Sequence, residues 1–197
     1  PDLVCTSDGL QQEIREELRD RGYHVHHHEP SRLAEVLAGF QSLAAAAGVA
    51  NAGEALVADC RRRLDAVAEE VGIDDREVAS DTDRPVVYCE EWSDPPMAAG
   101  NWVPDAVEAA GGRYPFVEPG DRSQEVDENT VVDADPDHAV LHICGTGDDV
   151  SADRFVDRGW SLDAEVHVVD DSLLNQPSPK LIDGIELLAK RLYPERA

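Results

Sequence analysis

Positive charge is scarce in this sequence. Its 197 residues hold 42 acids against 17 bases, lysine occurs only at Lys180 and Lys190, and the formal net charge is -25. Phosphate binding needs clustered cations, and the only basic run is Arg61-Arg62-Arg63, so we expect no nucleic-acid partner. The acids are spread over the whole chain, which favours a surface adapted to high salt, where screening removes self-repulsion. An acidic surface that docks a basic partner is the alternative.

Long apolar runs are missing as well. Nothing in the sequence resembles a membrane span or a signal peptide, so we expect a protein that is not itself transmembrane. The sequence starts on Pro1 directly before an apolar run. We therefore expect an N-terminal portion to precede it, which leaves the compartment open.

Motifs of covalent chemistry are also lacking. The four cysteines, at positions 5, 60, 89 and 144, show no CxxC spacing, and we expect buried free thiols. No GxSxG elbow is present, and no serine or cysteine is paired with a histidine by spacing. The sequence therefore indicates a binding protein and no enzyme.

Apolar residues make up 42% of the chain, which is enough for a real core. Their periodicity predicts strands that alternate with helices, an α/β fold with a parallel sheet and flanking helices. The expected strands are 3–5, 23–28, 84–90, 138–144 and 164–169. The expected helices are 10–22, 31–47 (capped by Ser31), 52–71, 103–110, 126–133, 145–158 and 181–192. The polar segment 72–84, with Asp74, Asp75, Asp81 and Asp83, is interpreted as a linker.

The chain is best understood from residues 84–112, where a buried strand is followed by an elaborate loop and a helix. Ligands of parallel sheets bind at the carboxyl ends of strands, so we expect the loops after strands 84–90, 138–144 and 164–169 to converge. Together they present a broad, mostly apolar floor that suits a large planar or macrocyclic ligand. The candidate ligand-binding residues are Glu91, Trp92, Asp94, Pro96, Met97, Asn101, Trp102, Gly145, Thr146, Ser172, Leu173, Leu174, Asn175 and, after the first strand, Ser7.

Several of these features have a plainer interpretation. Both tryptophans could be core anchors of a proline-rich turn. The Gly145-Thr146-Gly147-Asp148 segment is similar to a phosphate-binding loop, but a tight turn explains it as well. In the pairs Glu90-Glu91 and Asp170-Asp171, one member should face a cleft and the other should point outward.

The histidine run His24–His28 places alternate imidazoles on one face of a strand. Such a row could hold zinc, copper or nickel. No cysteine or carboxylate motif at ligand spacing accompanies it, which favours ordinary strand histidines.

The segments EEWSDPPMAAGNWVPDAVEAAGG and DDSLLNQPSPKLIDGIELLAKRLYP, together with PDLV near the start, resemble the cobalamin-binding proteins among the substrate-binding proteins of ABC importers for vitamin B12, haem and ferric siderophores. The resemblance covers essentially the whole chain. It implies two Rossmann-like lobes joined by one rigid helix, with the ligand between them. Residues 1–50 would be the end of a first lobe, 51–72 the connecting helix and 73–197 the second lobe.

The resemblance also implies a function. Trp92 and Trp102 would contact the macrocycle of a corrinoid, and Glu91, Asp94 and Asn101 would hydrogen-bond its amide edge. No covalent cofactor is implied, cobalamin or another metal chelate is the expected ligand, and ABC importer membrane subunits are the expected partners. Transport implies an extracytoplasmic cell-surface location, whereas a cytoplasmic corrinoid-handling protein or a small hydrolase on the same fold is the alternative.

Overall fold

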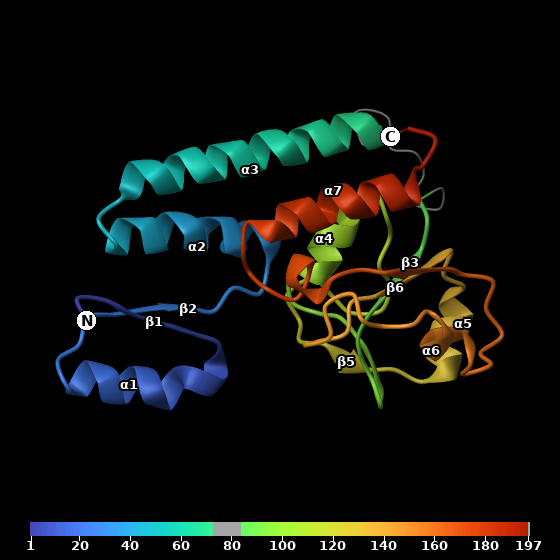
Figure 1. Ribbon diagram of the computed structural model, residues 1–197, viewed down its shortest axis with the longest axis horizontal. Helices are drawn as coiled ribbons and strands as arrows, with labels where there is room; N and C mark the ends of the chain where they lie inside the picture. Colours follow the sequence, from blue (N-terminus) through green and yellow to red (C-terminus); the bar gives the residue numbers. More distant parts are fainter. Residues whose placement is uncertain (73–83, 197) are drawn as a thin grey trace.

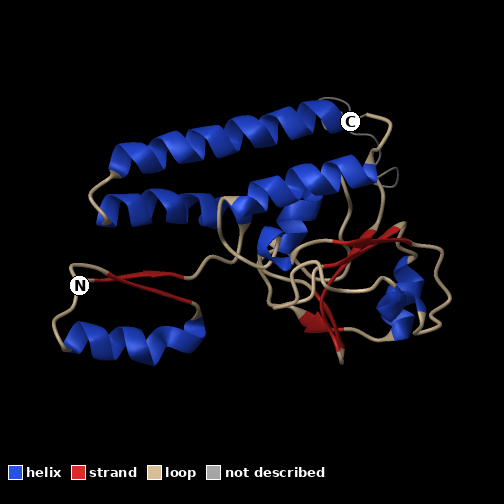
Figure 2. Ribbon diagram, viewed as in Figure 1, coloured by secondary structure: helices blue, strands red, loops and turns tan. Residues whose placement is uncertain are grey.

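The computed structural model describes residues 1–72 and 84–196 of the chain. This part forms a two-stranded sheet and a five-stranded sheet, each accompanied by helices, so the predicted α/β class is confirmed. The N-terminal elements form the narrow end of the molecule and the larger sheet lies at the other end (Figures 1 and 2). The predicted linker that contains Asp74, Asp75, Asp81 and Asp83 lies outside the described residues.

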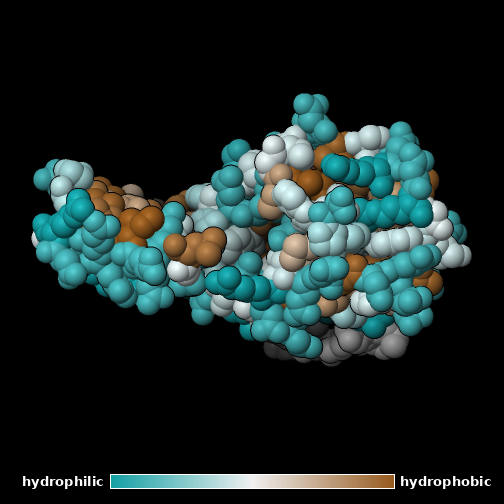
Figure 3. Space-filling view, turned by 90° about the horizontal axis from the view of Figure 1, so that it is seen from below, coloured by the Kyte–Doolittle hydropathy of each residue, from teal (hydrophilic) through white to brown (hydrophobic). Residues whose placement is uncertain are grey.

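The narrow end is built on two parallel strands, β1 (Val4–Ser7) and β2 (Val25–His28). Between them the chain forms the 3-10 turn η1 (Gly9–Gln11) and helix α1 (Gln12–Asp20). Helix α1 buries none of its residues, and Leu10 is 84% exposed. Seen from below, hydrophobic residues gather at this end, whereas most of the remaining visible surface is hydrophilic (Figure 3).

Two helices connect the narrow end to the larger sheet. Helix α2 (Leu33–Ala46) packs against the long helix α3 (Ala50–Val71), which continues until it lies beside α7 (Lys180–Leu192) (Figure 1). Arg63 of α3 donates to Glu186 of α7 through two hydrogen bonds of 2.7 Å. This geometry suits the predicted connecting helix, although the division at residues 50 and 72 stays a prediction.

The larger sheet has the strand order β5-β4-β3-β6-β7. Strands β3 (Val87–Ser93), β6 (His138–Leu141) and β7 (Glu165–Val168) are parallel, as predicted. Strand β4 (Pro96–Ala98) returns antiparallel to β3, and β5 (Gln124–Glu125) pairs antiparallel with β4. The expected open loop after Glu90 is therefore a hairpin, whose turn contains a cis peptide bond between Asp94 and Pro95. The two prolines concealed this short strand, because proline is rare inside sheets.

Both faces of the central strand β3 are covered. Val87 lies with Val107 of α4 (Val103–Ala109) and Leu192 of α7 around Gly112. Tyr88 points the other way, and its ring centroid is 6.0 Å from that of Phe155 in α6 (Asp153–Val156). Burial on both faces explains the continuous apolar run that predicted this strand.

Three local predictions are wrong. The helix expected over 145–158 is only the short α6, and α5 (Glu128–Ala134) begins two residues later than expected. Cys5 and Cys144 are exposed, so only Cys60 and Cys89 are buried thiols. An apolar sequence context predicted burial, but both exposed cysteines lie at strand or loop positions on the surface.

The cap expected for the second helix also differs. Arg32, and not Ser31, occupies the N-cap position of α2, and it makes no side-chain cap hydrogen bond. The backbone amide of Leu33 instead donates to a carboxylate oxygen of Asp105 in α4 at 2.9 Å. A residue remote in sequence therefore caps this helix, which no local pattern could reveal.

Candidate functional site

A cavity of about 450 Å³ lies where the narrow end meets the larger sheet. Its lining comes from the loops after β1 and β2, the end of β3, the start of α4, the 120–123 loop and the segment before α7. The lining residues are Ser7, Asp8, Glu29, Pro30, Ser31, Glu91, Asn101, Trp102, Gly120, Arg122, Ser123, Asn175 and Pro177. The structure thus brings together five of the predicted residues, namely Ser7, Glu91, Asn101, Trp102 and Asn175.

Two of the predicted loops are joined directly at this cavity. The indole nitrogen of Trp102 donates a hydrogen bond of 2.7 Å to the carbonyl oxygen of Leu174. Trp102 is only 9% exposed, and Leu174 is fully buried. The tryptophan therefore anchors the wall of the cavity, and only a small part of its ring is open to a ligand.

Asn101 is held in an unusual backbone conformation at the cavity wall. Its φ angle is 53°, and its amide and carbonyl groups bond to Asp121 and Gly120 of the neighbouring loop. Asp8, on the opposite side, has a φ angle of 68°. Non-glycine residues rarely adopt positive φ, and such positions cluster at functional sites. Two of them face one cavity here, which supports this cavity as the ligand site.

Acidic groups outnumber basic groups in the cavity. Asp8, Glu29 and Glu91 line it with one cation, Arg122, whose guanidinium lies 3.9 Å from Glu29. Burial raises the pKa of Glu91, and a hydrogen bond with Ser123 opposes that shift. The cavity is therefore polar and disfavours anionic groups.

The 120–123 side of the cavity was missed by sequence reasoning. Residues 114–124 are rich in proline and glycine and carry no recognisable motif, so nothing in the sequence marks Arg122 and Ser123 as binding residues. Their signal is structural, because the amide of Gly100 donates to the hydroxyl of Ser123 at 3.0 Å. That contact holds the loop against the turn before α4 only once the chain has folded.

Asn175 closes the cavity from the third loop. Its amide nitrogen donates to the carbonyl oxygen of His142 at 2.9 Å and to the sulfur of Cys144 at 3.0 Å. Its side-chain oxygen contacts Nδ1 of His142, which is fully buried. Burial lowers the pKa of His142 to about 4, so the imidazole is neutral near pH 7.

The other nine predicted ligand residues do not line this cavity and stay predictions. Trp92 is 48% exposed, and its indole nitrogen donates to the carbonyl oxygen of Asp94 at 2.9 Å. Pro96 and Met97 lie in β4, and Gly145 and Thr146 belong to the loop after β6. Ser172 and Leu173 lie in the turn η3 (Asp171–Leu173), directly before the buried Leu174.

The segment that is similar to a phosphate-binding loop binds a group of the protein itself. The amides of Gly145 and Gly147 donate to the carboxylate of Asp171 at 2.7 and 3.1 Å. Asp170 accepts from the amide of Ser172. Neither acid of this pair lines the cavity.

In the other acid pair, Glu90-Glu91, only one of the two predicted orientations is found. Glu91 faces the cavity, as expected, but Glu90 is buried and not directed to solvent. Arg158 binds the carboxylate of Glu90 with two bonds of 2.6 and 2.7 Å. A buried charge is stable only when it is paired, and this pairing explains the burial.

The histidine run lies beside a second hollow of about 690 Å³, which is lined mostly by apolar residues of α2 and α3 together with His26 and His28. Within residues 1–72 and 84–196, His24–His28 belong to no group of three metal-ligating side chains whose ligand atoms converge. Ordinary strand histidines are therefore the better interpretation.

A cavity between two α/β parts that a long helix accompanies is typical of a solute-binding protein. The family model described as "Periplasmic binding protein" matches residues 1–161. The chain belongs to the periplasmic binding protein family, which confirms the family resemblance expected from the sequence. A comparison with curated proteins finds no match.

Solved structures share the fold. The apo haem-binding protein RhuT from Roseiflexus sp. RS-1 superposes with a TM-score of 0.79 at 20% identity, over 100% of this chain and 77% of its own. The vitamin B12 binding protein BtuF of Vibrio cholerae gives 0.72 at 18% identity, over 98% and 74%. An Fe3+-hydroxamate transport protein from Saccharomonospora viridis gives 0.71 at 22% identity, over 98% and 69%.

No helix within the described residues has the length and apolar character needed to cross a membrane.

Proposed function

We propose that this chain is the substrate-binding protein of an ABC-type importer and that its cavity captures a corrinoid such as cobalamin. The observation that carries the proposal is the polar, acid-rich lining formed by Asp8, Glu29 and Glu91. The similar structures named for vitamin B12, haem and Fe3+-hydroxamate support metal chelates as the ligand class.

The acidic lining distinguishes between these ligands by their charge. Haem carries two carboxylates, and three acids against Arg122 would repel them inside a partly desolvated cavity. A corrinoid presents neutral amide groups at its edge, which both donate and accept hydrogen bonds. The lining therefore favours the corrinoid over haem.

The wall residues then have separate roles. Asn101 and Glu91 hydrogen-bond the amide edge, and Trp102 adds a limited apolar contact. Asn175, whose side chain is bonded to His142 and Cys144, shapes the wall beside them. A cavity of about 450 Å³ holds one edge of the macrocycle, so the rest of the ligand extends over the rim. Binding proceeds without covalent chemistry, and the loaded protein delivers its ligand to importer membrane subunits at the extracytoplasmic cell surface.

The side chain of Asn101 offers the sharpest test. Asn101→Gly keeps the positive φ angle accessible while it removes the side chain with its amide group. We expect cobalamin affinity to fall at least tenfold, about 1.4 kcal/mol, in a fluorescence titration at constant high salt. Asp135→Gly is the matched control, because Asp135 also has a positive φ angle, 46°, but does not line the cavity. Equal affinity in wild type and Asn101→Gly would argue against this binding mode.

A further inference from the structure

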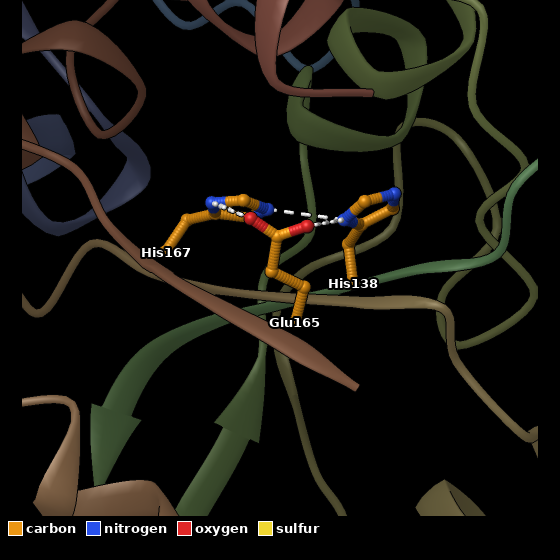
Figure 4. A group of neighbouring side chains, drawn as sticks. All are labelled: His138, Glu165 and His167. Atoms are coloured by element: carbon orange, nitrogen blue, oxygen red, sulfur yellow. Dashed lines mark hydrogen bonds and ion pairs between the residues drawn. The ribbon is translucent and has the colours of Figure 1, made fainter. Parts of the chain in front are cut away.

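A cluster of two histidines and one glutamate lies on the larger sheet, away from the cavity. His138 begins β6, and Glu165 and His167 lie on the neighbouring strand β7. Their ligand atoms all lie within 4.8 Å of one another. Figure 4 shows the three side chains pointing toward one another from the two strands.

The strand register explains why these residues meet. His138 is the partner of Glu165, and Val140 is the partner of His167. Side chains two residues apart share a face of a strand, and partners on adjacent strands share that face too. All three side chains therefore project from one face of the sheet, although Glu165 comes 27 positions after His138 in the sequence.

The distances are close to those of a metal centre. Nδ1 of His138 lies 3.0 Å from Nε2 of His167 and 4.0 Å from a carboxylate oxygen of Glu165. Ligand atoms bound about 2.1 Å from a tetrahedral zinc ion are about 3.4 Å apart. The observed separations bracket this value, and a small rotation of the 68% exposed Glu165 side chain would bring its oxygen closer.

The burial of the three side chains also suits a metal site. The His138 and His167 side chains are only 13% and 4% exposed, and their rings stack with centroids 5.2 Å apart. Buried imidazoles supply rigid nitrogen ligands, and the exposed carboxylate leaves one side open to solvent. Asp137 adds a negative charge near His138, whereas Arg191 of α7 adds a positive charge near His167.

We propose that His138, His167 and Glu165 bind one divalent transition-metal ion of the zinc type, with water as the remaining ligand. Two imidazoles and a carboxylate are a donor set that zinc, nickel and copper accept. The ion would replace the hydrogen that the two imidazoles now share, and it would tie the edge strand β7 to β6.

This site is distinct from the cavity. The cavity lies beyond the carboxyl end of the parallel strands, whereas His138 and Glu165 are the first residues of theirs. The length of β6 alone separates the two regions by roughly 10 Å. The ion is therefore not the transported ligand, and the proposal does not depend on the proposed function.

The test uses the full chain, stripped of metal with a chelator and held at constant high salt, with Zn2+ as the probe. Competition against a chromophoric chelator gives affinity and stoichiometry. We expect one tight equivalent, and at least a tenfold loss of affinity in both His138→Asn and Glu165→Gln. His26→Asn is the control from the histidine run, and it should bind Zn2+ as wild type does.

Co2+ absorption gives an independent signature, since a tetrahedral site has intense visible bands that His138→Asn should lose. Glu165→Gln keeps the proposal testable if the buried histidine variant does not fold. Unchanged affinity in Glu165→Gln with an unchanged circular dichroism spectrum, absence of a tight equivalent, or loss of the equivalent in His26→Asn would each overturn the site. Cobalamin retention is measured separately, so failure of one proposal leaves the other standing.

Discussion

Asp105 of α4 binds Arg32 through two hydrogen bonds of 2.7 and 2.8 Å, across 73 positions of the sequence. The same carboxylate accepts from the amide of Leu33 and so caps α2. Because Ser31, beside this contact, lines the cavity, the pair fixes the wall on the side of the narrow end. The carboxylate of Asp105 thus joins α4 to the start of α2.

Asp105→Ala should destabilise the protein. Loss of the cap on the Leu33 amide alone costs about 1 kcal/mol of unfolding free energy. Urea denaturation at fixed salt measures the loss, and Glu54→Ala, at an exposed position of α3, is the control. Equal denaturation midpoints for wild type and Asp105→Ala would show that the contact contributes nothing.

The buried pair of Glu90 and Arg158 should show a larger effect. Glu90 also accepts hydrogen bonds from Tyr88 at 3.0 Å and Ser93 at 2.7 Å. Arg158→Met would leave the buried carboxylate of Glu90 without a counter-charge, and such a loss typically lowers the free energy of unfolding by about 3–5 kcal/mol. Adding Glu90→Gln should restore more than half of the lost stability, because the uncompensated charge is then gone.

Chemical denaturation of the single and double variants completes this cycle. The exposed Arg154 of α6, four residues before Arg158, provides the control Arg154→Met. A single variant Arg158→Met that loses less than about 1 kcal/mol would mean that the pair is not stabilising.

The buried His142 predicts acid sensitivity. Its pKa is about 4 in the folded protein and 6.5 in the unfolded chain, so the unfolded chain binds the proton first as the pH falls. Unfolding free energy should therefore drop between pH 6.5 and pH 4, by about 3 kcal/mol from this residue. Above pH 6.5 the contribution is constant.

Denaturation midpoints at pH 7, 5.5 and 4.5 check the slope. His142→Gln should flatten the pH dependence relative to wild type. Parallel curves for wild type and His142→Gln would contradict the assignment to His142.

The charge of the cavity predicts its ligand preference. Glu29 is half exposed and contacts Arg122, so Glu29→Lys changes the cavity by two charges without removing a buried group. We expect haem, which carries carboxylates, to bind at least fivefold more tightly, and cobalamin to change less than twofold. Glu70→Lys, at an exposed position of α3, controls for the net charge of the protein.

Absorbance titrations with both ligands give the two affinities. The same gain in haem affinity in Glu70→Lys would indicate a general charge effect of the acidic surface. Unchanged haem affinity in both variants would show that the cavity does not repel anions.

Much of the fold could be predicted from the sequence, because burial on both faces leaves a strong local signal. The apolar runs around Val87 and Val140 predicted two parallel strands, and the long stripe through Val57 and Val67 predicted α3. Strand β4 could not be predicted in the same way, since Pro96 and Met97 lack the period-two pattern of a strand.

The candidate site, too, was predictable from the sequence only in part. Glu91 and Asn175 follow the predicted strands 84–90 and 164–169, and Asn101 precedes a predicted helix, so topology alone placed them at one edge. Arg122 and Glu29 come from segments with no motif, and only the packing of the loops brings them to the cavity. The cap from Asp105 and the pairing of His138 with His167 likewise depend on tertiary neighbours that no local period encodes.

The central claim, that the cavity retains a neutral, amide-rich chelate, is tested most directly by ligand retention. The full chain is incubated separately with cobalamin, haem and a ferric siderophore in high salt, desalted, and measured by visible absorbance. We expect cobalamin to stay with the protein near one equivalent and haem to be lost on desalting. Retention of haem with loss of cobalamin would contradict the claim that the cavity binds a neutral, amide-rich chelate.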